Sequence, residues 1–296
     1  MDASSFSLRL ADGRSLDVAV SGRDDATPLV FHHGTPSGSL QYRPFARAAV
    51  ACGLRLVSYS RPGYASSTRQ PDRDVAGCAA DVAAILDHLG ADRCYTAGAS
   101  GGGPHALACA TLLPDRVLAC ASIAGAAPFD AEGLDPLEGM GEENVEEFGA
   151  ALASPAALQA FLDGAARSYA GVTGEQVADA LGGLVSPVDR AALTGDYADW
   201  VAASFRQALS GGIWGWFDDD LAFVRPWGFE LDDLRVPVTV WQGGQDRMVP
   251  FAHGEWLAAH LPGAKAMLLP SEGHLSIAVA RFAEVVDDLL RSAPEP

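Results

Sequence analysis

The sequence predicts an α/β fold, with a mostly parallel central sheet flanked by helices and a helical insertion within it. Runs typical of buried strands alternate with helix-like runs at both ends of the 296-residue chain. This alternation stops at Pro128 and resumes after about Leu234, and short helical patterns fill the interval. We therefore expect residues 1–127 and 235–296 to form one core, with residues 128–234 as a helical insertion between its two parts.

The first part of the chain predicts a hairpin followed by alternating strands and helices. Asp12-Gly13 separates two segments in which apolar and polar residues alternate, which is typical of a hairpin. Continuous apolar runs favour buried parallel strands, and apolar residues at helical spacing favour helices. The expected strands are 6–10, 16–20, 28–31, 54–59, 94–97 and 117–123. The expected helices are 45–52, 75–89 and 104–109.

The last part of the chain repeats this pattern after the insertion. Within the insertion, residues 155–162 and 198–209 have helical spacing. After it, the expected elements are strands at 236–241 and 266–269 and helices at 251–261 and 277–290. The loops that follow parallel strands open on one edge of such a sheet, where ligands commonly bind.

The composition excludes several classes of partner. The chain has 20 Lys and Arg against 38 Asp and Glu, a formal net charge of −18, which argues against nucleic acid and membranes as partners. We expect a small-molecule substrate. The sequence does not indicate a particular oligomeric state. The five cysteines lack metal-type spacing and predict reduced packing residues in a cytoplasmic protein. Neither a signal-peptide pattern nor a run of membrane-spanning length is found in the sequence.

Gly98-Ala99-Ser100-Gly101-Gly102 lies between an expected strand and an expected helix. A serine at the apex of such a turn has a strained backbone, so the residues two before and two after it must be small. The turn directs the serine hydroxyl toward the helix N-terminus, where free N–H groups and the helix dipole stabilise an oxyanion. Ser100 is therefore the expected nucleophile, and the alternative is an ordinary glycine-rich turn.

A serine nucleophile needs a base and an acid that orients it. His274 lies between the last expected strand and the last expected helix, and Asp246 follows the strand before. The order Ser100, Asp246, His274 is typical of one group of triad enzymes. The other histidines considered, His88, His105, His253 and His260, lie on expected helices, where surface or packing roles are usual, and His253 is the main competing base.

An oxyanion also needs two backbone donors. One is the N–H of Gly101, directly after the nucleophile. The other is expected in the loop His33-Gly34-Thr35-Pro36, which follows the third expected strand. Gly34 lets the loop turn sharply, and Pro36 has no N–H, so Thr35 is the second expected donor. The alternative is a plain Gly-Pro loop.

Together these residues resemble the α/β-hydrolase superfamily over nearly the whole chain. The matching motifs are His33-Gly34-Thr35-Pro36, Arg61-Pro62-Gly63-Tyr64, the Ser100 turn and the loops of Asp246 and His274. The resemblance implies a serine hydrolase with a helical cap that closes over the serine. The family's arginine motif usually begins with Asp, and Ser60 stands there, so we expect no salt bridge from that position. We expect Arg61 to support the oxyanion loop.

The expected cap contains aromatic residues beside glycines between residues 211 and 229. Trp214 and Phe223 are the expected substrate contacts, and packing of the cap against the core is the alternative. Asp218-Asp219-Asp220 suggests capture of a substrate ammonium group, as in the prolyl aminopeptidases of this superfamily. The other interpretation of these aspartates is a helix N-terminus, where acidic residues are favoured.

The sequence thus predicts a hydrolase that cleaves a small-molecule carboxylic ester through a Ser-His-Asp triad and an acyl-enzyme, without metal or organic cofactor. Epoxide hydrolases and haloalkane dehalogenases resemble it in the His-Gly-x-Pro loop but carry an aspartate at the nucleophile position, and Ser100 argues against both. Aminopeptidase, amidase and carbon–carbon hydrolase activities on the same triad are alternatives. A small-molecule receptor of the same fold is the alternative from another class.

Overall fold

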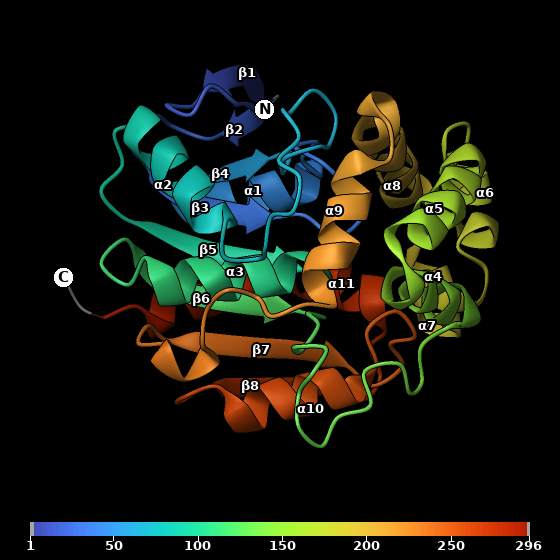
Figure 1. The fold of residues 1–296 in the computed structure, drawn as a ribbon. Coiled ribbons are helices and arrows are strands. Elements are labelled where there is room, and N and C mark those ends of the chain that lie inside the picture. The colour runs from blue at the N-terminus through green and yellow to red at the C-terminus, as the bar shows by residue number, and fades with distance from the viewer. Residues whose placement is uncertain (1–2, 295–296) are drawn as a thin grey trace.

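A twisted sheet with the strand order β1-β2-β4-β3-β5-β6-β7-β8 runs through the centre of the computed structural model, which describes residues 3–294 (Figure 1). Residues 1–2 and 295–296 of the expected core lie outside that range. β1 and β2 are antiparallel to their neighbours and the other strands pair in parallel, which confirms the predicted fold class. The strands are β1 (Ser4–Arg9), β2 (Ser15–Ser21), β3 (Thr27–His32), β4 (Leu54–Tyr59), β5 (Cys94–Ala99), β6 (Val117–Ile123), β7 (Val238–Gly243) and β8 (Lys265–Leu269).

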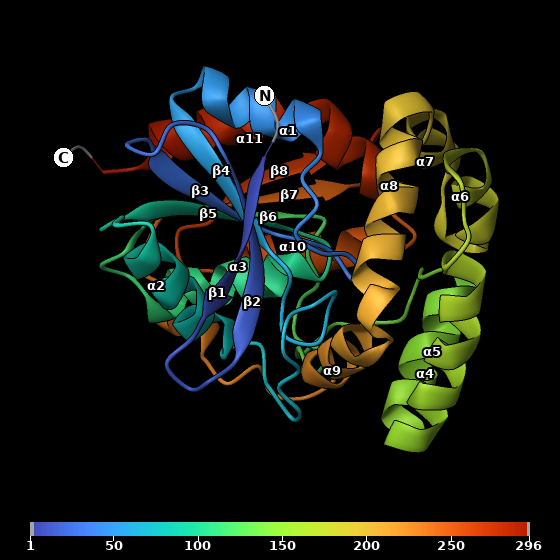
Figure 2. The same ribbon diagram turned by 90° about the horizontal axis from the view of Figure 1, so that it is seen from above.

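Helices cover both faces of the sheet (Figure 2). α1 (Arg43–Ala51) and α11 (His274–Ser292) pack on one face, where Phe45 and Phe282 stack with ring centroids 4.0 Å apart. α2 (Cys78–His88), α3 (Gly102–Leu112) and α10 (Phe251–His260) pack on the other. β4 and β7 are buried along their whole length, and each carries polar residues among its apolar ones, namely Arg55 and Ser58 in β4 and Thr239 and Gln242 in β7.

The segment between β6 and β7 is helical. Its helices are α4 (Glu142–Ala153), α5 (Pro155–Tyr169), α6 (Gly174–Ala180), α7 (Pro187–Ala192), α8 (Gly195–Ala208) and α9 (Trp214–Phe223), with short 3₁₀ turns at Gly182–Leu184, Leu209–Gly211 and Leu231–Asp233. Most of these helices share an apolar cluster of their own, which includes Leu158, Leu162 and Val201. Figures 1 and 2 show this helical insertion over the end of the sheet to which the parallel strands point.

Element boundaries differ from the sequence prediction by a few residues at most places. The helix expected at 155–162 continues to Tyr169, and the last helix begins at His274 instead of residue 277. His274 is therefore in the first turn of α11 and not in a loop. Among residues 3–294, none of the helices combines the length and apolar character needed to cross a lipid bilayer.

Candidate active site

Ser100 occupies the turn between β5 and α3 with a strained backbone. Its φ is +56°, in the left-handed region that residues other than glycine rarely adopt. A Cβ atom on Gly98 would overlap the carbonyl oxygen of Gly102, and one on Gly102 would overlap that of His32. Only glycine fits at these two positions, so the local sequence forces the turn that presents Ser100 at the edge of the sheet.

Asp246 and His274 are joined by a hydrogen bond of 2.8 Å between Oδ2 and Nδ1. The other carboxylate oxygen of Asp246 accepts the N–H groups of Met248 and Val249, each at 2.8 Å. The side-chain amide of Gln242 donates to Oδ2 at 3.0 Å. These donors fix the carboxylate, which in turn holds the buried imidazole with its proton on Nδ1 and Nε2 free to accept one.

The environment of His274 favours its protonated form. Burial is the largest single influence and lowers the pKa, but the charge and the hydrogen bond of Asp246, followed by the charge of Asp189, outweigh it. The pKa of His274 therefore lies above the ordinary value of 6.5. A raised pKa makes the neutral imidazole a stronger base, which suits it to take a proton from a hydroxyl group and to return it to a leaving group.

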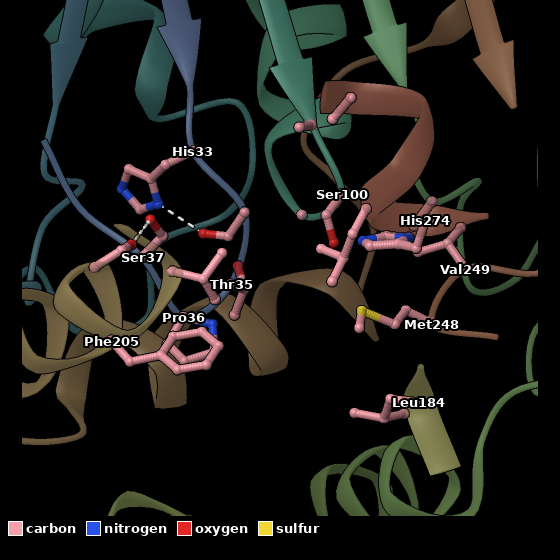
Figure 3. Close-up of a pocket in the computed structure, with 18 of the residues that line it drawn as sticks. His33, Thr35, Pro36, Ser37, Ser100, Leu184, Phe205, Met248, Val249 and His274 are labelled. Atoms are coloured by element: carbon pink, nitrogen blue, oxygen red, sulfur yellow. Dashed lines mark hydrogen bonds between the residues drawn. The ribbon is translucent and has the colours of Figure 1, made fainter. Parts of the chain in front are cut away.

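The hydroxyl of Ser100 and the ring of His274 border the same cavity, and Figure 3 shows them facing one another. No hydrogen bond between them occurs in the described part of the chain. The structure thus brings Ser100, Asp246 and His274 to one end of the sheet. Catalytic hydrogen bonds are often long in the absence of substrate and shorten when it binds.

The loop after β3 runs beside Ser100. A Cβ atom on Gly34 would lie 3.3 Å from Cβ of Ser100, and one on Gly101 would overlap the side chain of Thr35. Within residues 3–294, the backbone N–H groups of Thr35 and Gly101 have no hydrogen-bond partner. The backbone N–H groups of both expected oxyanion donors therefore lie next to Ser100 without a hydrogen-bond partner among the described residues.

Arg61 supports this loop, as the sequence predicts. Its guanidinium donates to the carbonyl oxygens of His33 at 2.6 Å and Gly34 at 3.2 Å. Its carboxylate partner is supplied by the helical insertion, since Asp219 of α9 lies 2.6 Å away. Ser60 accepts the N–H of Ser39 and takes no part in this ion pair.

Asp219 joins the insertion to the oxyanion loop. It lies 2.6 Å from Arg61 and 2.6 Å from Arg73, and it accepts the hydroxyl groups of Thr35 at 2.8 Å and Tyr64 at 2.7 Å. Burial alone would raise the pKa of this carboxyl, but the two arginines hold it well below its usual range. Asp219 is therefore a fully paired buried anion.

The interpretation of the three aspartates as a helix N-terminus is wrong. α9 begins at Trp214, so the aspartates lie in the middle of the helix, beyond its first turn, and each has a different environment. Asp218 pairs with Arg69 at 2.8 Å, and Asp219 is paired as above. Only Asp220 lines the cavity, and neither of its buried oxygens has a hydrogen-bond partner among the described residues.

The two expected aromatic contacts have different positions. Phe223 lines the cavity beside Gly101, as expected for a substrate contact. Trp214 is not among the cavity-lining residues, and its ring lies 4.0 Å from the guanidinium of Arg69. The expectation for Trp214 is wrong because α9 begins there and turns this side chain toward the Arg69–Asp218 ion pair.

His253 also borders the cavity, but its ring nitrogens are both engaged. Nδ1 accepts the N–H of Ala127 at 3.1 Å, and Nε2 donates to the carbonyl oxygen of Pro136 at 2.9 Å. Burial lowers the pKa of His253 more than the hydrogen bond to Pro136 and the charge of Asp246 raise it. His253 therefore braces the start of the insertion and has no nitrogen available to activate Ser100.

The cavity has a volume of about 210 Å³ and is lined mainly by apolar side chains from both the sheet end and the insertion. Sequence reasoning missed most of the lining residues, because single apolar positions on separate helices carry no motif. Met248 and Val249 are exceptions, since they directly follow Asp246. Residues missed in the insertion include Glu147, Tyr169, Leu184, Tyr197, Phe205 and Trp216.

One group of side chains in the described part of the chain has ligand atoms close enough for a metal ion: buried His32, Cys78 and Cys109, within 4.8 Å of one another. None of the three lines the cavity. Both nitrogens of His32 have partners, at 3.2 Å from the hydroxyl of Thr96 and 3.5 Å from that of Tyr59. His32, Cys78 and Cys109 are therefore packed inside the protein core.

Comparison with known proteins places the chain in a family. The sequence model described as alpha/beta hydrolase fold matches residues 27–280. The chain belongs to the α/β-hydrolase fold family. The solved structure of a hydrolase from Pseudomonas aeruginosa has a TM-score of 0.70 and 21% identity, covering 97% of this chain and 98% of that one.

Relatives of this α/β-hydrolase include esterases and haloperoxidases, at low identity. A non-heme chloroperoxidase from Streptomyces lividans is 28% identical over 89% of this chain and 90% of its own length. A bifunctional esterase/perhydrolase from Acinetobacter calcoaceticus is 28% identical, covering 81% and 82%. The acetyltransferase component of an acetoin cleaving system from Pseudomonas putida is also 28% identical, over 89% of this chain, which spans 62% of that longer protein.

Proposed function

We propose that this α/β-hydrolase cleaves a small-molecule carboxylic ester, with Ser100 as nucleophile, His274 as general base and Asp246 as the residue that orients it. The observation that carries the proposal is the 2.8 Å bond between Asp246 and His274 at the same cavity edge as Ser100. A serine held at φ +56° beside unpartnered backbone N–H groups supports it.

In the proposed acylation step, Nε2 of His274 takes the Ser100 proton as Oγ attacks the ester carbonyl carbon. The negative charge on the carbonyl oxygen is stabilised by the N–H groups of Thr35 and Gly101. His274 then gives its proton to the alcohol oxygen as the carbon–oxygen bond breaks, which leaves an acyl group on Ser100. Asp246 stabilises the imidazolium that forms in between.

Deacylation repeats the same steps with water. His274 takes a proton from a water molecule, whose oxygen attacks the acyl carbon, and returns the proton to Oγ of Ser100. The carboxylic acid leaves and the enzyme is restored. The mainly apolar lining of the cavity suits the acyl or alcohol part of an ester, and the esterase activity named for the Acinetobacter relative agrees with this substrate class.

Hydrolysis of p-nitrophenyl esters of increasing acyl length tests the proposal, with wild type and Ser100→Ala assayed side by side. We expect turnover by the wild type and a fall in kcat of several orders of magnitude in the variant. Circular dichroism shows whether both proteins are folded. A folded wild type that hydrolyses none of the esters contradicts the proposed function, and an unchanged kcat in Ser100→Ala contradicts the nucleophile.

A second candidate function is hydrolysis of a substrate that carries an ammonium group, including amides such as proline amides. The specific observation is Asp220, whose two buried oxygens have no described partner and border the cavity near Glu147. Burial, followed by the neighbouring charge of Glu147, raises the pKa of Asp220 well above its usual range. A substrate ammonium group placed beside the two carboxyl groups would favour their ionised forms and supply the missing hydrogen-bond donors.

Matched esters with and without an ammonium group on the acyl chain test this candidate. If it is correct, wild type prefers the cationic ester in kcat/KM, and Asp220→Asn loses the preference while it still hydrolyses the neutral ester. Asp218→Asn is the control, because that carboxylate pairs with Arg69 outside the cavity. Equal rates on both wild-type substrates, together with no turnover of proline amides, would exclude it.

A further inference from the structure

Asp189 of the helical insertion is a fully buried carboxylate that the proposed chemistry does not use. It lies on α7 and its residue exposure is 0%. The hydroxyl of Ser186 donates to its Oδ2 at 2.8 Å, and its own N–H donates back to that hydroxyl at 3.3 Å. A buried carboxylate is costly unless several donors satisfy it, so its remaining partners show what it holds.

Those partners are the first backbone N–H groups of α11. Oδ2 of Asp189 accepts from His274 at 3.1 Å, and Oδ1 accepts from Leu275 at 2.8 Å and Ser276 at 2.9 Å. The first N–H groups of a helix have no partner within it, and a side chain directly before the helix usually caps them. Here Gly273 precedes the helix, and a Cβ atom there would overlap the Asp189 carboxylate.

We propose that Asp189 is a positioning residue, supplied by the insertion, that holds the first turn of α11 and thereby sets the orientation of His274 for proton transfer. This inference rests on the proposed function in one respect, namely that His274 is the general base. The side chain of His274 projects from the first residue of the helix, so a rotation or fraying of that turn would displace its ring. Hydrogen bonds from three successive N–H groups to one carboxylate oppose both movements.

Asp189 also acts on the charge of His274. The N-terminus of a helix carries positive partial charge and disfavours an imidazolium, and the Asp189 carboxylate compensates this effect. The pKa of His274 is lowered by burial and raised first by Asp246 and then by Asp189. Asp246 and Asp189 are the charged groups that act directly on the ring, and Glu272, two residues before His274, is paired with Arg281. The titratable side chains that line the cavity with His274 are His33, Tyr42, Glu147, Tyr169, Tyr197, Asp220 and His253. Removal of the Asp189 charge lowers the pKa of His274 when the others are unchanged.

Asp189→Asn tests the proposal, because it keeps the shape and removes the charge. We expect kcat to fall about tenfold, which is the effect of losing one hydrogen bond to a charged group, and KM to stay nearly unchanged. We also expect the acid limb of the kcat/KM profile to move to lower pH.

Asp288→Asn is the matched control, because it removes a buried carboxylate from α11, the helix of His274. Asp288 lies 14 residues after His274, about 21 Å along the helix, and bonds to Thr239 and Lys265.

A folded Asp189→Asn protein with wild-type kcat and an unmoved acid limb would overturn the proposal, as would an equal effect in Asp288→Asn. If Asp189→Asn does not fold, Ser186→Ala removes one of the bonds that fix the carboxylate. A kcat reduced a few-fold at constant KM is then expected, and an unchanged kcat overturns the proposal.

NMR titration of the His274 ring separates this inference from the proposed function, since the titration needs no turnover. A lower His274 pKa in Asp189→Asn supports the inference even if no ester is hydrolysed, and an equal pKa contradicts it.

Discussion

The end of the sheet and the helical insertion both supply residues to the cavity, but they do so through different kinds of contact. At the sheet end, Ser100 is held by glycines two residues away, and Asp246 accepts N–H groups two and three residues further on. In the insertion, Asp219 reaches Thr35 across 184 positions of sequence and Asp189 reaches His274 across 85. The first set of contacts is local, and the second exists only in the folded chain.

This difference separates two roles. In the proposed mechanism the residues at the sheet end carry out the bond-making steps, and their geometry depends on turns that short motifs encode. In the same proposal the acidic residues of the insertion hold the loop after β3 and the start of α11, or line the cavity that would take the substrate. Variants of the sheet end should therefore abolish most of the rate of chemistry in a folded protein. Variants of the insertion should change stability, pH dependence or selectivity, with at most a moderate loss of rate, as expected for Asp189→Asn.

The largest effect is expected for Asp246→Asn. The amide no longer fixes the tautomer of His274 or stabilises its cation, so we expect kcat to fall by about 10⁴-fold with the fold intact. Steady-state hydrolysis of a reactive ester and thermal unfolding measure the two quantities. Asp24→Asn, an exposed aspartate in the loop before β3, is the control. A loss of less than tenfold would show that Asp246 does not orient the base.

The next effect is a loss of stability in Asp219→Asn. Two buried guanidinium groups, those of Arg61 and Arg73, lose their anionic partner, so we expect the free energy of unfolding to fall by about 3–5 kcal/mol. Urea unfolding followed by tryptophan fluorescence measures it. Asp218→Asn is the neighbouring control, with a partner, Arg69, that is partly exposed, and should cost about 1 kcal/mol or less. Equal losses in the two variants would contradict the distinction.

The smallest effect is on the pH dependence of the wild type. His274 must be neutral to accept the Ser100 proton, so kcat/KM falls as pH drops through the pKa of its ring. Asp246 and Asp189 raise that pKa against the opposing effect of burial, so the acid limb should lie above pH 6.5. A kcat/KM profile from pH 5 to 9 measures it. An acid limb below pH 6.5 would show that burial outweighs the two carboxylates.

The sequence predicted the sheet, most helices and the sheet-end residues for physical reasons. Buried parallel strands leave continuous apolar runs, as at residues 28–31 of β3, and the turn around Ser100 requires glycine at set positions. Asp246 and His274 each follow a strand, and parallel strands bring the loops that follow them to one edge. Spacing along the chain was therefore enough to predict that these residues meet.

The insertion was not predictable in the same way. Its helices were expected, but which face each turns to the core depends on packing between helices that no motif records. Trp214 therefore packs on Arg69 outside the cavity, and the aspartates of α9 have partners that sequence spacing did not indicate. The residues around Asp189 form no motif that would reveal its role, because its partners are backbone N–H groups. The glycine before His274 was the one trace, since only glycine leaves room for that carboxylate.

The most direct test of the central claim, an activated serine at the sheet end, is the intact mass of the protein after incubation with a fluorophosphonate, followed by peptide mapping. The account predicts one adduct, located on Ser100 and absent from Ser100→Ala. It also predicts much slower labelling in Asp246→Asn. A folded wild type without an adduct, or with the adduct on another residue, would contradict it.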